Sequence, residues 1–163
     1  MNSETLPTYL NDHLALMTGE IELLQRVCEE NSGSSLAREL QSFGSSVQQQ
    51  ADLLGGWLKS LDAPPATLKQ AAAWLGEKLG RLKLNDGGLE YTDLARLVEL
   101  EALIGCAISR QIMWDALAKV PTGELRVQPE MLSQFAAEAH DQQETLRRHH
   151  SLAATQVFSS DSK

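Results

Sequence analysis

Residues 62–91 read DAPPATLKQAAAWLGEKLGRLKLNDGGLEY, and this stretch decides the fold because it separates two pairs of long amphipathic segments. Pro64 and Pro65 end the segment before it, since a residue that precedes proline is disfavoured from the helical conformation. Residues 65–79 have the spacing of a short helix, and NDGG at 85–88 is a turn signal. A connection of about 30 residues can return from one end of a bundle to the other, so it predicts a long crossover between two parallel helices.

Two helices are predicted before this crossover, at residues 7–30 and 35–61. Their apolar positions recur in alternating steps of four and three, which places them on one helix face. The first stripe contains Leu10, Leu14, Met17, Ile21, Leu24 and Cys28, and the second contains Leu36, Leu40, Phe43, Val47, Gln50, Leu54, Trp57 and Leu61. Ser34 or Ser35 suits the N-cap of the second helix, and the short turn before it predicts antiparallel neighbours.

Two more helices are predicted after the crossover, at residues 92–119 and 129–157. Thr92 is a suitable N-cap, and Pro129 suits the first turn of a helix because proline has no amide hydrogen to leave unpaired. The stripe predicted for 92–119 is Leu94, Leu97, Glu101, Ile104 and Ile108, widened by Leu100, Leu103, Ala107 and Trp114. The stripe predicted for 129–157 is Leu132, Phe135, Ala139, Gln142, Leu146, His149 and Ala153. The chain is therefore predicted to be one all-α domain, a four-helix bundle over residues 1–158, with a frayed tail at 159–163.

Composition and charge exclude several classes of function. Aromatic residues make up 5% of the chain, which favours helices over sheets, and the net charge of −8 disfavours binding to nucleic acid. No apolar run reaches the roughly 20 residues that a transmembrane helix needs, and no signal peptide is evident. Cys28 and Cys106 form no zinc or disulfide pattern, so a cytoplasmic protein is expected.

The order of two helices, a crossover with a short helix, and two further helices resembles the ferritin-like superfamily. The segments AWLGEKLGRLKLN at 73–85 and LARLVELEAL at 94–103 resemble a group of small bacterial ferritin-like proteins. The resemblance implies ferritin-like connectivity. It also implies a di-iron site, in which two helices each supply a Glu and the other two each supply a Glu-x-x-His motif.

The ligand set that this resemblance implies is incomplete in this chain. Glu20 and Glu101 can take the two single-carboxylate positions, but Gln50 and Gln142 stand where the Glu-x-x-His motifs should begin. Amides bind metals weakly and bring no charge, so the family's metal chemistry is not expected. The four residues are predicted to form one polar layer at mid-height in the bundle, with His149 about two turns further along the last helix.

Two interpretations of this polar layer remain open. Buried polar residues commonly fix helix register and topology, and this structural role is the one we expect. We therefore expect a non-enzymatic ferritin-like protein without a cofactor, which binds or scaffolds a protein partner or forms a homodimer through an exposed helix face. The alternative is a metal-binding protein or metal-dependent oxidoreductase, in which a degenerate carboxylate site holds an ion.

The crossover suggests a third class of function. Its amphipathic helix carries basic residues and a tryptophan, a combination that can lie on an anionic membrane or on an acidic partner. These residues are Lys69, Trp74, Lys78, Arg81 and Lys83. The same amphipathicity is expected of a helix that merely covers the bundle, because packing requires one apolar face. A small-molecule ligand, the true partner and the source are not identified by these residues.

Overall fold

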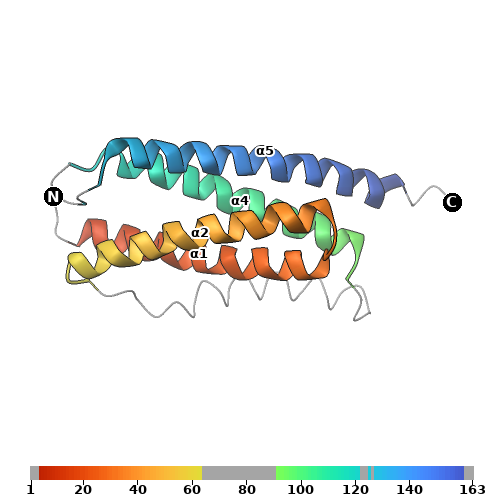
Figure 1. Cartoon of the computed structure of the whole chain (residues 1–163), viewed down its shortest axis with the longest axis horizontal. Coiled ribbons are helices and arrows are strands. Elements are labelled where there is room, and N and C mark those ends of the chain that lie inside the picture. Colours follow the sequence, from red (N-terminus) through yellow and green to blue (C-terminus); the bar gives the residue numbers. More distant parts are fainter. Residues whose placement is uncertain (1–3, 64–90, 122–124, 126, 160–163) are drawn as a thin grey trace.

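The computed structural model describes residues 4–63, 91–121, 125 and 127–159 of the chain. Within these ranges it contains four helices and no strand (Figure 1), which confirms the prediction of an all-helical bundle. The helices are α1 at Thr5–Glu30, α2 at Ser35–Ser60, α4 at Asp93–Leu117 and α5 at Pro129–Ser159. The short helix predicted at 65–79 and the last four residues of the predicted tail lie outside the described ranges.

Local hydrogen bonds explain where two of the helices begin. The hydroxyl of Ser34 accepts a hydrogen bond from the backbone N–H of Ala37 at 3.1 Å, and the hydroxyl of Thr92 accepts one from Ala95 at 3.1 Å. Each serves an amide that has no partner within its own helix, so Ser34 and Thr92 are N-caps. Pro129 is the first residue of α5, where its missing N–H costs nothing.

Side-chain pairs between helices define their directions. Glu20 and Arg26 of α1 bind Arg110 and Glu99 of α4 respectively, so α4 runs antiparallel to α1. The tight turn after α1 makes α2 antiparallel to α1 as well, and α2 and α4 therefore point in the same direction (Figure 1). As a result, the C-terminal end of α2 and the N-terminal end of α4 lie at opposite ends of the bundle (Figure 1).

Three of the four predicted apolar stripes point into the core. Most stripe residues of α1, α2 and α5 are buried. The apolar exceptions are half-buried and pack against the core, and they are Ile21, Cys28, Phe43, Leu61 and Phe135. His149 is half-buried as well. The aromatic rings of Trp57 and Trp114 meet edge to face with centroids 6.1 Å apart, and Phe135 lies 4.9 Å from Trp114. This aromatic contact joins α2, α4 and α5.

The stripe predicted for α4 is wider than the true core face. Leu94 and Glu101 are exposed, and Ile104 and Ile108 are half-buried. The residues that α4 buries are Leu97, Glu99, Leu100, Leu103, Ala107, Arg110, Met113, Trp114 and Leu117. Burial of Leu97 and of the widening residues Leu100, Leu103, Ala107 and Trp114 is thus confirmed. The positions around Glu101 were assigned wrongly, because α4 is apolar on several sides and its periodicity does not select one face.

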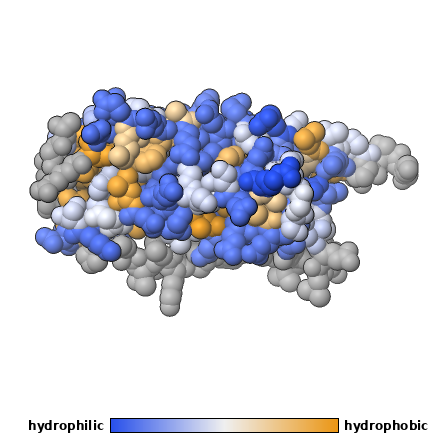
Figure 2. All heavy atoms as spheres, viewed as in Figure 1, coloured by the Kyte–Doolittle hydropathy of each residue, from blue (hydrophilic) through white to orange (hydrophobic). Residues whose placement is uncertain are grey.

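The outer surface is mixed in character. Figure 2 shows hydrophilic side chains spread over one face of the molecule, with smaller apolar areas between them. In the part of the chain that the structure describes, no helix combines the length and the apolarity needed to cross a membrane.

Candidate functional site

Three of the four predicted layer residues meet at the centre of the bundle. Glu20, Gln50 and Gln142 are 2%, 1% and 4% exposed, and they surround Arg110, which is 2% exposed. Glu20 lies on α1, Gln50 on α2, Arg110 on α4 and Gln142 on α5. Every helix in the described ranges therefore contributes one residue to this layer, which we call the central network together with Trp114.

The guanidinium of Arg110 is the hub of the central network. Its Nε and Nη2 atoms donate to the two carboxylate oxygens of Glu20 at 2.7 and 3.0 Å, which is the bidentate geometry of a strong Arg–carboxylate pair. Nη2 also donates to Oε1 of Gln142 at 2.5 Å, and Nη1 donates to Oε1 of Gln50 at 3.4 Å. The one charged donor thus binds a side chain from each of the other three helices.

Gln50 links this hub to the seam between α2 and α5. Its Oε1 accepts a hydrogen bond from the indole Nε1 of Trp114 at 3.0 Å, so the amide orientation is fixed. Its Nε2 then donates to Oε2 of Glu138 at 3.0 Å, and the other oxygen of Glu138 accepts from the hydroxyl of Ser46. The network therefore extends from the buried centre to the half-buried Glu138.

Burial and the charge of Arg110 act in opposite directions on the ionisation of this centre. Burial raises the pKa of the Glu20 carboxyl, while the charge and hydrogen bonds of Arg110 lower it. Nearby on α4, burial raises the pKa of the Cys106 thiol to about 12, and the Glu20 charge adds to that rise. Cys106 is consequently a protonated thiol at neutral pH and is not an activated nucleophile.

Glu101 does not belong to the central network, and its predicted place there is corrected. Its side chain is 56% exposed, and its Oε1 lies 3.2 Å from Nε2 of His150 on α5. The error follows from the misassigned face of α4, since Glu101 lies on the side of the helix that points away from the core. Arg110 occupies the α4 position in the layer instead.

His149 is also separate from the central network. Its Nε2 lies 2.5 Å from Oε2 of Glu39, so it connects α5 to α2 near the surface. His149 and His150 are adjacent, and they reach carboxylates on two different helices. Each histidine therefore faces a single carboxylate, which is too few ligands for a metal ion.

A second ion pair, of which only the carboxylate is fully buried, lies between α1 and α4. Arg26 contacts the carboxylate of Glu99 at 2.5 Å, and Glu99 is 1% exposed. The hydroxyl of Tyr91 donates to Glu99 at 2.9 Å and accepts from Nδ2 of Asn31 at 3.1 Å. In this pair α1 supplies the cation and α4 the anion, whereas in the central network α1 supplies the anion and α4 the cation.

The central network does not fit a di-iron site. Two iron ions require several carboxylates, but Glu20 is the one carboxylate among the five residues, and it is bound on both oxygens by a cation. The amide oxygens of Gln50 and Gln142 accept hydrogen bonds from the same cation. Across the described ranges, no group of three or more His, Cys, Asp or Glu residues is placed to hold a metal ion.

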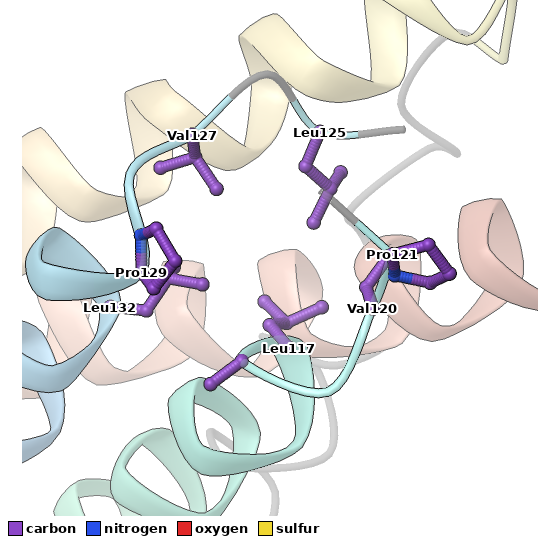
Figure 3. A pocket seen from close by; sticks show the side chains of 8 residues that line it. Leu117, Val120, Pro121, Leu125, Val127, Pro129 and Leu132 are labelled. Carbon is purple, nitrogen blue, oxygen red and sulfur yellow. The ribbon is translucent and has the colours of Figure 1, made fainter. Parts of the chain in front are cut away.

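A small apolar pocket lies at the end of the bundle, where α4 leads to α5. Figure 3 shows Leu117, Val120, Leu125, Val127 and Leu132 around it, with Pro121 and Pro129 at its sides. None of the described residues that line it has an ionisable side chain. The described lining therefore supplies no polar side chain that would orient a ligand.

The residues of the predicted basic surface lie outside the described ranges. They are Lys69, Trp74, Lys78, Arg81 and Lys83.

Sequence reasoning missed Arg110 and Glu138, although a signal for Arg110 was present. Arg110 falls in the four-three spacing of Leu100, Leu103, Ala107, Trp114 and Leu117, which is the true core stripe. A charged residue inside such a stripe requires a buried partner. Glu20 on α1 supplies that partner. No comparable signal marks Glu138.

Comparison of the chain with protein-family models, with curated proteins and with solved structures found no match.

Proposed function

We propose that this chain is a non-enzymatic ferritin-like bundle that binds or scaffolds other proteins, in which a fixed ion pair stands in place of a metal centre. The directions of the helices support ferritin-like connectivity, because α2 and α4 run parallel and their linked ends lie at opposite ends of the bundle. The resemblance seen in residues 73–85 and 94–103 points the same way.

One observation carries the proposal: the guanidinium of Arg110 reaches a side chain on each of the other three described helices. In a di-iron protein, this mid-bundle position belongs to metal-bridging carboxylates. A guanidinium supplies fixed positive charge there without an exchangeable coordination site. The centre is therefore suited to hold the helices in one arrangement and not to activate oxygen or a substrate.

The arrangement also explains why a polar layer persists in an apolar core. A bidentate pair with defined amide partners has one favourable geometry, so it penalises shifted helix registers. The second pair, Arg26 with Glu99, repeats this restraint with reversed polarity on the same two helices. A rigid bundle of this kind presents its outer faces in a constant arrangement, which suits a binding or scaffolding protein.

Metal analysis of protein purified without a histidine tag tests this proposal. Fe(II), Mn(II) and Zn(II) are offered separately, excess metal is removed, and bound metal is measured by mass spectrometry. We expect no stoichiometric metal in the wild-type chain or in Glu20→Ala. Stoichiometric metal in the wild type that is lost in Glu20→Ala would overturn the proposal and favour a degenerate metal-binding site. Glu22→Ala, on the exposed side of α1, is the matched control.

A further inference from the structure

We draw no further inference here: the strongest candidate, the apolar surface patch on the outward face of α4 with the exposed side chains of Leu94 and Ile112, carries nothing because nothing in the structure shows what covers it.

Discussion

At the scale of single residues, the centre of the bundle depends on polar groups that satisfy one another. Arg110 is bound by the carboxylate of Glu20 and by the amide oxygens of Gln50 and Gln142. Each of these groups has lost its contact with water, so removal of one leaves its partners unpaired. Such losses cost more than the net contribution of the hydrogen bonds themselves.

Gln50→Leu should destabilise the fold more than a leucine substitution elsewhere on α2. It removes the acceptor of the Trp114 indole and the donor to Glu138, and each unpaired buried group costs about 1–3 kcal/mol. Gln49→Leu, at the exposed neighbouring position, should change the free energy of unfolding by less than about 0.5 kcal/mol. Urea unfolding of the two variants makes the comparison. An equal decrease in the unfolding free energy of both variants would show that the hydrogen bonds of the Gln50 amide do not stabilise the fold.

Cys106 should make the wild type more sensitive to alkali. Its pKa is about 12 in the folded chain against an ordinary value of 9.0, so the unfolded chain releases this proton first. The free energy of unfolding therefore falls as the pH rises from about 9 toward 12, by at most about 1.4 kcal/mol per pH unit from this group. Urea unfolding between pH 8 and pH 11 should show a smaller decline for Cys106→Ala than for wild type. Parallel declines would contradict the assignment.

The polar layer predicted from the sequence contained three of the five residues of the central network. Gln50 and Gln142 interrupt clear apolar stripes, and Glu20 lies one step from the stripe of its helix, so their burial could be anticipated. Arg110 was marked only by its place in the four-three spacing of α4, and this signal is weak because an arginine on a helix that is apolar on several sides is normally assumed to reach solvent. Its burial depends on Glu20, which is 90 residues away in the chain.

At the scale of secondary structure, the starts of the helices could be predicted from local signals in the sequence. Ser34 and Thr92 cap the helices that follow them, and Pro129 begins α5. The sequence did not predict which face of α4 is turned toward the core, because apolar residues occur on both its inner and outer faces. Only the positions of the neighbouring helices determine which face is buried.

Ser34→Ala should weaken the start of α2. It removes the acceptor of the Ala37 amide, and loss of an N-cap costs about 1 kcal/mol. Ser35→Ala is the control, since Ser35 is the first helical residue, is exposed and is not the cap. Thermal unfolding followed by circular dichroism should give a lower midpoint for Ser34→Ala alone. A lower midpoint for Ser35→Ala instead would assign the cap to the other serine.

At the scale of the whole molecule, two ion pairs of opposite polarity hold α1 against α4, and Arg110 extends one of them to α2 and α5. The all-helical bundle was predictable from periodicity, whereas these pairings between distant residues were not.

A double-mutant cycle of Glu20 and Arg110, measured by urea unfolding, tests most directly whether an ion pair holds the centre. Glu20→Met and Arg110→Met should each cost about 3–5 kcal/mol, because each leaves a buried charge without its partner. The double variant should cost far less than the sum, with a coupling of about 2 kcal/mol or more between the two residues. If the stability losses of the two single variants sum to the loss of the double variant within about 0.5 kcal/mol, Glu20 and Arg110 do not act as a pair.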